Sequence, residues 1–355
     1  MKIALFGCGK VGFAIAMLGK QLGYDMLLFD INLTSLKRVS EATGFPAFEL
    51  RLDEFYLKPP SQLLQANVIL SALPFFETFK AAQIARKYNL NYVDLTEDIE
   101  SARKVAEMSQ SARNFFMPQT GLAPGLISVY AKKLYREFNS IQSVQLRVGA
   151  LPLFPNNRLK YNLTWSTEGL INEYIQDCVV IQDGEIKKVP PLEGYETFSI
   201  DGVLYEAFNT SGGLGSLAET LLGKALNVNY KSIRYPGHRE FIKFLLDDLQ
   251  FRRNPSQIVQ ILENSIPSTA QDKCLVFVSV IGEKNGKLEQ KTFVSSFYHK
   301  KIQEIDFSAI QLVTAAGALA CLTQAFRENR SGFVKVENLN EDQILEHEAL
   351  RLINS

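Results

Sequence analysis

The sequence predicts an α/β fold in which a doubly wound parallel sheet carries an inserted, mixed α+β domain. Three features of the first third of the chain indicate the parallel sheet. A glycine-rich turn directly follows a short apolar run, an acidic residue ends the second apolar run, and apolar runs then alternate with helical patterns as far as residue 118. Such alternation is typical of parallel sheets, because parallel neighbours must be joined by a long crossover, which is usually a helix.

The glycine-rich turn has the pattern G-x-G-x-x-G, formed by Gly7, Gly9 and Gly12. In a dinucleotide-binding turn the first glycine permits the sharp bend and the second lets a pyrophosphate approach. The third allows the next helix to pack on the strand. The N–H groups that begin this helix, at Lys10 and Val11, suit the charge of a pyrophosphate. We therefore expect a Rossmann domain with its phosphate site here.

The second expected strand, residues 24–30, ends in Asp30, 18 residues after Gly12. A carboxylate at this position can accept hydrogen bonds from the adenine-ribose hydroxyls and would repel a 2′-phosphate, which favours NAD over NADP. Lys37 and Arg38 lie on the following helix and are positively charged, so NADP stays the alternative cofactor. The other expected cofactor contacts lie at or just after the ends of expected strands, at Ile31, Ala72, Leu73 and Pro74.

The remaining elements follow from hydrophobic periodicity. In the first domain, strands are expected at 67–74, 91–96 and 114–118, and helices at 35–44, 76–89 and 99–112. After Pro118, strands are expected at 143–151 and 159–165, hairpins turning at Asp183-Gly184 and Asn285-Gly286, and helices within 121–138, 238–250 and 255–265. An apolar helix at 308–326 is too interrupted for a membrane span and is expected to pack on the first domain. We expect a dinucleotide-binding domain at 1–122, a substrate-binding and dimerisation domain at 123–305, and a C-terminal helical segment at 306–355.

Composition narrows the classes of function. The 355 residues include 38 basic and 38 acidic side chains, so no excess charge favours nucleic acid or an anionic membrane as a partner. The N-terminal apolar run is broken by glycines and does not have the pattern of a signal peptide. Four distant cysteines and three scattered histidines lack disulfide or metal spacing, and Cys8 is expected to be a small filler in the turn. We expect a cytoplasmic protein that binds a small molecule and no metal.

Five motifs in order along the chain resemble one known family. They are YVDLTED (92–98), GLAPGL (121–126), KYNLTWSTEGLINEY (160–174), EAFNTSGGLGSL (206–217) and IRYPGH (233–238). Together they resemble the saccharopine dehydrogenase-like proteins over nearly the whole chain, and are most similar to the lysine 6-dehydrogenase branch. The resemblance implies NAD(P)-linked oxidation at a C–N bond of a lysine-derived amino acid, and a homodimer.

The resemblance leaves the exact reaction open. Saccharopine dehydrogenases hydrolyse the imine to release glutamate or lysine, whereas lysine 6-dehydrogenase releases ammonia and allysine. A different class of function, a non-catalytic NAD(P) sensor, is the alternative. The long second domain favours an enzyme, because a sensor needs only the first domain and an interaction surface.

Glu97 is the first candidate for a catalytic base or a partner of the substrate ammonium group. It follows an expected strand end, where open α/β sheets bind ligands. The alternative is that Glu97 supplies a negative charge to the helix expected to start near Ile99. The nearby Asp94 is expected to be structural because it lies within the strand.

The motif IRYPGH supplies two further candidates. His238 is the second candidate base, with a packing role as its alternative. Arg234 is a candidate to bind the substrate α-carboxylate with two parallel hydrogen bonds, and a surface salt bridge is its alternative.

Other substrate contacts are expected from Pro124 and Gly125 and from an expected strand that contains Tyr161 and Asn162. On that strand Tyr161 shares a face with Trp165, for which core packing is the safer interpretation, while Asn162 points the other way.

The glycine-rich stretch 206–221 could be a linker, a phosphate loop or part of a substrate pocket. It lies inside a domain and has no G-K-[ST], so a small-anion loop with free N–H groups before a helix is favoured. The expected donors to a substrate carboxylate are Thr210, Ser211, Gly212 and Gly213. A turn needed only for packing is the alternative.

Overall fold

The computed structural model describes residues 1–354, and the chain divides into two compact units. The first unit comprises Met1–Leu126 and Gln311–Ser355, and the second comprises Ile127–Ile310. The chain passes from one unit to the other after residue 126 and again after residue 310. The domain boundaries expected from the sequence, after residues 122 and 305, lie within a few residues of these two positions. The middle of the chain is therefore inserted into the first unit.

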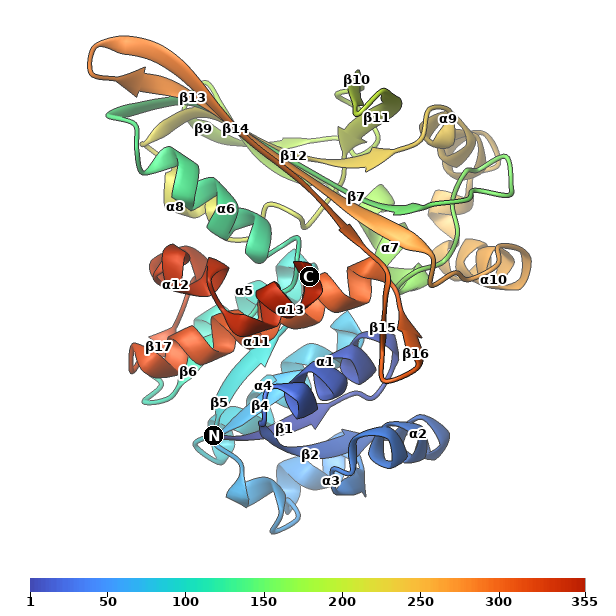
Figure 1. Ribbon diagram of the computed structural model, residues 1–355, viewed down its shortest axis with the longest axis vertical. Helices are drawn as coiled ribbons and strands as arrows, with labels where there is room; N and C mark the ends of the chain where they lie inside the picture. Colours follow the sequence, from blue (N-terminus) through green and yellow to red (C-terminus); the bar gives the residue numbers. More distant parts are fainter. Residues whose placement is uncertain (355) are drawn as a thin grey trace. The chain divides into compact units, whose positions relative to one another are not determined.

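The first unit contains a seven-stranded sheet in which every pair of neighbours is parallel (Figure 1). In spatial order the strands are β17 (Gly332–Phe333), β6 (Phe115–Met117), β5 (Asn91–Asp94), β4 (Val68–Ser71), β1 (Lys2–Phe6), β2 (Asp25–Asp30) and β3 (Ala47–Glu49). The doubly wound sheet predicted from the sequence is confirmed. The short edge strands β3 and β17 were not predicted, because a run of two or three residues is too short to show an alternation of apolar and polar side chains.

Helices precede and follow the strands of the first unit. They are α1 (Lys10–Gln21), α2 (Leu33–Thr43), α3 (Leu52–Leu57), α4 (Phe75–Lys87), α5 (Ile99–Ser109), α11 (Ala309–Arg327), α12 (Glu341–Leu345) and α13 (Glu348–Asn354). Among the described residues, α11 alone has the length and apolar composition of a membrane-crossing helix, and 72% of its most apolar window is buried. Phe326 of α11 makes an edge contact with Phe115 of β6, so this helix packs within the first unit as predicted.

The motif 121–126 forms the turn through which the chain leaves the first unit. Gly125 has a φ of +123°, and a Cβ there would lie 2.5 Å from the carbonyl oxygen of Gly121. Gly317 of α11 packs on the same turn, where a Cβ would lie 3.0 Å from that oxygen. The glycines are thus required for close packing. The expected contact of Pro124 and Gly125 with substrate stays a prediction.

The second unit is built on an eight-stranded mixed sheet. Its main path runs β10 (Glu196–Ile200), β11 (Val203–Asn209), β12 (Ala225–Arg234), β7 (Ser140–Pro152), β13 (Asp272–Lys284) and β14 (Lys287–Tyr298), and β8 (Cys178–Gln182) joins β12 to β9 (Glu185–Val189). Both predicted hairpins are confirmed, and the long β13–β14 hairpin is the extended orange ribbon of Figure 1. Strands β10, β11 and β12 were not predicted as strands.

The helices of the second unit are short. They are α6 (Leu126–Tyr135), α7 (Thr167–Ile175), α8 (Leu217–Leu221), α9 (His238–Lys243) with a π-turn at Phe244–Asp248, and α10 (Pro255–Ser265); a small hairpin, β15 (Lys300–Ile302) and β16 (Ile305–Phe307), precedes α11. Residues 217–221 form a single short helix instead of the amphipathic helix expected after the glycine-rich stretch.

The strand predicted at 159–165 is wrong. In this segment only Leu163 pairs with another backbone, in an isolated bridge to Ser268. Leu159, Tyr161 and Leu163 are instead buried in an apolar cluster with residues of α7 and α10. An extended segment that buries alternate side chains has the same period as a strand, so the pattern could not distinguish the two.

The glycines of the first turn provide a matched pair of substitutions. A Cβ on Gly12 would lie 1.9 Å from the carbonyl oxygen of Gly7, whereas a Cβ on Gly9 would meet no atom within 4 Å. We expect Gly12→Ala to lower the free energy of unfolding by about 1–3 kcal/mol or more, because the helix must move away from the strand. Gly9→Ala should change it by about 0.5 kcal/mol or less. Thermal unfolding followed by circular dichroism would measure both, and equal losses would contradict the packing role of Gly12.

Candidate active site

The glycine-rich turn of the first unit has the geometry of a phosphate site. Gly7 has a φ of +96°, and a Cβ there would lie 2.7 Å from the carbonyl oxygen of Ala72. Gly9 is the N-cap of α1 and no side chain caps this helix, so the first-turn N–H groups at Lys10 and Val11 have no side-chain acceptor at the cap. Free N–H groups beside a glycine without a Cβ contact fit a pyrophosphate.

Asp30 lies at the end of β2, buried beside this turn. Its Oδ2 accepts a hydrogen bond from the Cys8 N–H at 2.5 Å, and its Oδ1 accepts one from the Asn32 N–H at 2.7 Å. Burial, with Asp30 as the next cause, raises the pKa of the Cys8 thiol to about 12, so the thiol stays protonated. Cys8 is thus a buried filler, as predicted, and Asp30 keeps lone pairs for a ribose hydroxyl.

Two acids, one at the end of β5 and one beyond it, have structural roles. Asp94 is buried, and its Oδ1 accepts hydrogen bonds from the Thr96 N–H at 2.9 Å and the Gln119 N–H at 3.1 Å. Asp98 is the N-cap of α5 and accepts a hydrogen bond from the Ser101 N–H at 2.7 Å. The helix-start role considered for Glu97 therefore belongs to Asp98.

Glu97 lies between these two acids and is partly buried. Burial is the main cause that raises the pKa of its carboxyl group to about 7, and the charges of Asp98 and Asp94 add to it. Within residues 1–354 no Lys or Arg forms an ion pair with Glu97. A carboxyl group that exchanges its proton near neutral pH has the property required of a general base, so Glu97 stays the first candidate.

Arg234 is the central charge of the second unit. Its side chain is buried in β12; its Nε donates to the Tyr174 hydroxyl at 3.0 Å and its Nη1 to the Ile233 carbonyl at 2.8 Å. The surface salt bridge considered as an alternative is wrong, since Arg234 is 3% exposed. In the part of the chain that the structure describes, no carboxylate lies within ion-pair distance of it. A buried guanidinium of this kind suits an anionic ligand.

His238 is completely buried at the start of α9. Its Nδ1 lies 2.9 Å from the Leu159 carbonyl oxygen, and its Nε2 lies 3.0 Å from the Tyr174 hydroxyl. Because a carbonyl can only accept, Nδ1 carries the proton and Nε2 accepts from Tyr174. Burial, with the charge of Arg234 as the next cause, lowers the pKa of His238 to about 3.

The role predicted for His238 as a base is therefore corrected. Both ring nitrogens are occupied, and the low pKa keeps the ring neutral. The chain of hydrogen bonds runs from Leu159 through His238 and Tyr174 to Arg234, so His238 is a positioning residue that orients the Tyr174 hydroxyl, which in turn accepts from Arg234.

Glu206 positions the start of α9. It is buried in β11 and lies opposite Arg234 in the strand register. Its two carboxylate oxygens accept hydrogen bonds from the N–H groups of Gly237 at 2.8 Å and Arg239 at 2.7 Å. These bonds hold the first turn of α9 and with it the ring of His238.

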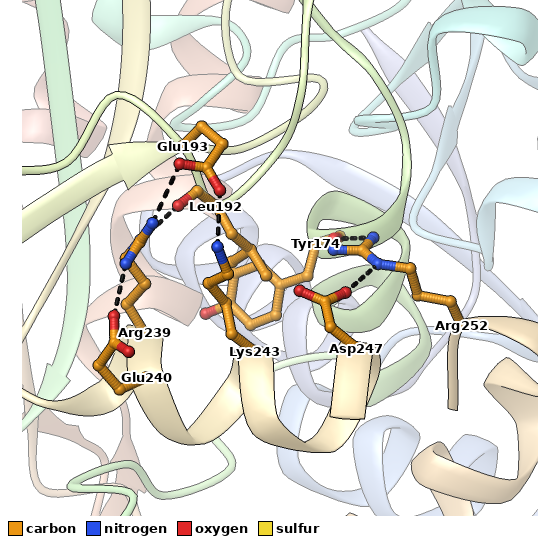
Figure 2. A network of polar contacts seen from close by, with 8 residues as sticks. All are labelled: Tyr174, Leu192, Glu193, Arg239, Glu240, Lys243, Asp247 and Arg252. Atoms are coloured by element: carbon orange, nitrogen blue, oxygen red, sulfur yellow. Dashed lines mark hydrogen bonds and ion pairs between the residues drawn. The ribbon is translucent and has the colours of Figure 1, made fainter. Parts of the chain in front are cut away.

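A set of partly exposed ion pairs, the outer ion pairs, lies near Tyr174, as Figure 2 shows. Arg239 contacts the carbonyl oxygen of Leu192 and the carboxylate of Glu193, and Lys243 contacts the same carboxylate at 2.7 Å. Leu192 has a φ of +64° and is fully buried. The ion pairs therefore hold a strained segment whose Leu192 side chain packs in the same apolar cluster as Tyr174.

The predicted contacts of the 160–165 segment lie beside Arg234. The Tyr161 ring centre is 5.3 Å from the guanidinium carbon of Arg234, and the Tyr161 hydroxyl accepts from the Trp165 Nε1 at 3.1 Å. Asn162 is also buried, and its Nδ2 donates to the Pro267 carbonyl at 3.2 Å. Its Oδ1 is buried without a partner in the described part of the chain.

The glycine-rich stretch has a different structure from the one expected. The Ser211 N–H donates to the Glu173 carbonyl at 3.0 Å, so it is not a free donor. The Thr210 hydroxyl lies 2.8 Å from that of Ser232, and a Cβ on Gly213 would lie 2.2 Å from the Tyr230 ring. The free donor expected at Ser211 is thus corrected. Gly213 is required for packing on Tyr230, and its expected N–H donation to a ligand stays a prediction, as do those of Thr210 and Gly212. Gly212, with a φ of +84°, allows the tight turn.

Three residues of the second-unit cluster carried no predicted function. Tyr174 and Glu173 lie in α7, within a motif quoted only for its resemblance, and Glu206 lies in the unpredicted strand β11. These residues could have been recognised as acidic or hydroxyl side chains on faces that are otherwise apolar. To assign a residue to a face, the bounds of its helix or strand must be known, and the sequence did not predict α7 or β11.

Comparison with known proteins gives two concordant results. The family model "Saccharopine dehydrogenase C-terminal domain" matches residues 121–352, which is more than half of the chain. Apo saccharopine dehydrogenase (L-Glu forming) from Saccharomyces cerevisiae matches over 97% of this chain and 96% of its own, with a TM-score of 0.76 and 16% identity. C. glutamicum DAP dehydrogenase matches with a TM-score of 0.50 and 12% identity over 100% and 98% of the two chains. At these identities the solved structures show the same fold.

The tautomer and charge of His238 can be tested directly. We expect the ring to stay neutral from pH 5 to pH 8, with the proton on Nδ1, because its pKa lies near 3. Two-dimensional NMR of the imidazole ¹⁵N nuclei would show both properties. In Tyr174→Phe the Nε2 resonance should shift, since its donor is lost. A midpoint of titration between pH 6 and pH 7 would contradict this assignment.

Proposed function

The chain belongs to the saccharopine dehydrogenase-like family of NAD(P)-dependent dehydrogenases, and we propose that it oxidises a C–N bond of a lysine-derived amino acid. The two candidate reactions are the conversion of L-lysine to allysine and ammonia, and the cleavage or formation of saccharopine. The observation that carries the proposal is the buried Arg234 guanidinium, which has no carboxylate partner in the described part of the chain. A substrate carboxylate would supply that partner.

The chemistry assigns distinct tasks to the residues. When bound, the nicotinamide accepts a hydride from the carbon attached to nitrogen. An ammonium group must first lose a proton, because hydride leaves only a carbon whose nitrogen has a free electron pair. Glu97 accepts this proton and passes it to solvent, so that after oxidation its carboxylate can remove a proton from the water that attacks the imine carbon. The protonated Glu97 returns that proton to the nitrogen, and the C–N bond breaks with its electron pair going to the nitrogen. The hydroxyl proton is lost to solvent as the aldehyde forms.

The cofactor proposed is NAD, and NADP is the alternative. Asp30 supplies a buried carboxylate at the end of β2, where a 2′-phosphate would be repelled. Arg38 lies nearby, with its guanidinium carbon 4.9 Å from the Phe13 ring centre, and is the cation that an NADP-binding form would use. We also propose a cytoplasmic location and a homodimer, the assembly that the resemblance implies.

A non-catalytic cofactor sensor is the alternative function. The buried cluster around Arg234 favours the enzyme, because a sensor of the dinucleotide has no use for a second buried binding group in the inserted unit. No observation favours the sensor specifically.

The proposal is tested by following NAD(P)H at 340 nm. Purified protein is supplied with NAD or NADP and with L-lysine or saccharopine. We expect reduction of the cofactor with one of these substrates, and ammonia or glutamate among the products identifies the reaction. No reduction in any of the four combinations would refute the proposed oxidation.

The pKa of Glu97 predicts the pH dependence. A base must be deprotonated, so kcat/KM should rise about tenfold per pH unit below pH 7 and level off above it. Glu97→Gln should lower kcat by about 10²–10⁴-fold and remove that inflection. Glu100→Gln, an exposed position on α5, is the matched control and should behave like the unaltered protein. Persistence of the inflection in Glu97→Gln would show that another group is the base.

A further inference from the structure

The long strand β14 forms one edge of the sheet of the second unit. It pairs with β13 on one side, and within residues 1–354 no strand pairs with its other side. It is 12 residues long, whereas β9 and β10, the other strands at the edges of this sheet, have five residues each. A long edge strand presents a row of unpaired backbone N–H and C=O groups to which another strand can pair.

The turn of the β13–β14 hairpin determines which residues of β14 direct their backbone groups outward. Asn285 and Gly286 have φ values of +54° and +76°, and the residues on either side of them pair with each other. Residues that flank such a two-residue turn form a hydrogen-bonded pair, and bonded and non-bonded pairs then alternate along the strands. The His299 N–H, which donates to the Asp272 carbonyl at 3.1 Å, follows the same alternation. Odd-numbered residues of β14 therefore bond to β13, and even-numbered residues direct their backbone groups outward.

The outward-directed positions of β14 lack the features that keep sheet edges apart. Natural edge strands usually carry charged side chains, prolines or bulges that prevent pairing with another chain. The outward-directed residues include no charge and no proline; they are Leu288, Gln290, Thr292, Val294, Ser296 and Tyr298. The charged side chains of β14 all lie on its other face, together with Phe293, which stacks on Tyr130 of α6 at 4.2 Å between ring centres. The strand thus offers an uncharged edge to a partner strand.

Three of the outward-directed residues have large, exposed apolar side chains. Leu288 is 69% exposed, Val294 is 45% exposed and Tyr298 is 53% exposed. Because successive side chains of a strand alternate between the two faces of a sheet, these three share one face. Leu288 and Tyr298 lie at opposite ends of the strand, so a twofold axis near its middle would bring Leu288 of one copy beside Tyr298 of another.

We infer that β14 pairs antiparallel with β14 of a second copy of this chain, around a twofold axis at Phe293, which joins the two sheets into one. This inference rests on the homodimer proposed above and specifies its interface. In this register Leu288 faces Tyr298 of the second copy, and Thr292 faces its Val294. Apolar side chains that lie directly opposite each other on neighbouring strands stabilise the pair.

The neighbouring registers fit less well. The outward-directed backbone groups allow only registers that place even-numbered residues opposite one another, so the axis moves along the strand in steps of one residue. An axis at Thr292 would place Leu288 opposite Ser296, and an axis at Lys291 would place two lysines opposite each other. Of these three registers, only the one centred on Phe293 places an apolar side chain opposite Leu288.

A proline at an outward-directed position tests the pairing. The Val294 N–H does not bond to β13, so Val294→Pro leaves the hydrogen bonds of the hairpin intact and removes one donor of each copy from the proposed interface. Sedimentation equilibrium of the full-length protein measures the Kd of the dimer against a monomer mass of 39.9 kDa. We expect the unaltered chain to form dimers, and Val294→Pro to raise this Kd by about tenfold or more.

Ile186→Pro is the matched control. Ile186 lies on the edge strand β9 of the same sheet and is 43% exposed. The turn at Asp183-Gly184 also has two residues, with φ values of +56° and +81°, so the same alternation directs the Ile186 N–H outward. This variant should dimerise like the unaltered chain. Circular dichroism checks that both proline variants are folded.

A pair of cysteines tests the register without a proline. Both Leu288 and Tyr298 are exposed, so replacing them removes no buried contact. Leu288→Cys/Tyr298→Cys should form a disulfide-linked dimer under mild oxidation, which a non-reducing gel detects. Within one chain, about 33 Å of extended strand separates the two positions, so only two copies can bring them together. Each single variant should stay unlinked.

The outcomes separate this inference from the proposed function. If folded Val294→Pro dimerises as tightly as the unaltered chain, the paired edge is overturned while the homodimer stands. Absence of a linked dimer in folded Leu288→Cys/Tyr298→Cys overturns the register and with it the inference. If the unaltered chain is a monomer at all concentrations, the homodimer fails as well, and the proposed oxidation is judged separately by the formation of NAD(P)H.

Discussion

The arrangement of side chains in the second-unit site depends on the hydrogen bonds that position one buried guanidinium group, that of Arg234. Burying Arg234 removes it from water, and its charge persists because arginine does not lose its proton in proteins. The hydroxyl of Tyr174, the ring of His238 and the carbonyl of Leu159 form a chain of hydrogen bonds behind it. Each donor in this chain has one acceptor, so the orientation of the guanidinium is determined by groups that never change their charge near neutral pH.

This constraint explains the arrangement of the surrounding elements. Segment 159–165 supplies both a carbonyl for His238 and the Tyr161 ring beside the guanidinium. Glu206 holds the first turn of α9 by two backbone N–H groups, and Arg239 and Lys243 hold the strained segment at Leu192. The outer ion pairs are partly exposed, so each adds little to the free energy of folding. Their contribution is to hold the segment at Leu192 in one position.

In the first unit, the position of the glycine-rich turn is set by backbone atoms that approach one another closely. At Gly7 and Gly12 an added Cβ would collide with backbone atoms, whereas at Gly9 it would meet no atom within 4 Å. The acids around the end of β5 differ in their contacts. Asp98 caps α5, and Asp94 accepts two backbone N–H groups at its Oδ1, while burial raises the pKa of Asp94 to about 6. Glu97 has a pKa raised to about 7 and no such structural role, which makes it the better candidate for proton transfer.

Local sequence patterns were sufficient for the longer strands of the first unit (β1, β2, β4, β5 and β6) and for both hairpins. A glycine spacing, an acid at a strand end and turns such as Asn285-Gly286 act through neighbouring atoms, so the sequence alone predicts them. The second-unit site could not be predicted in this way. His238 has the same sequence neighbours whether it is a base or a buried positioning residue, and the difference arises from Leu159 and Tyr174, which are distant in the chain. The free donors expected at Ser211 failed for the same reason, because their acceptor is the carbonyl of Glu173 in a helix that the pattern missed. Burial and long-range hydrogen bonds determine which polar groups remain available to a ligand, and both are properties of the folded chain.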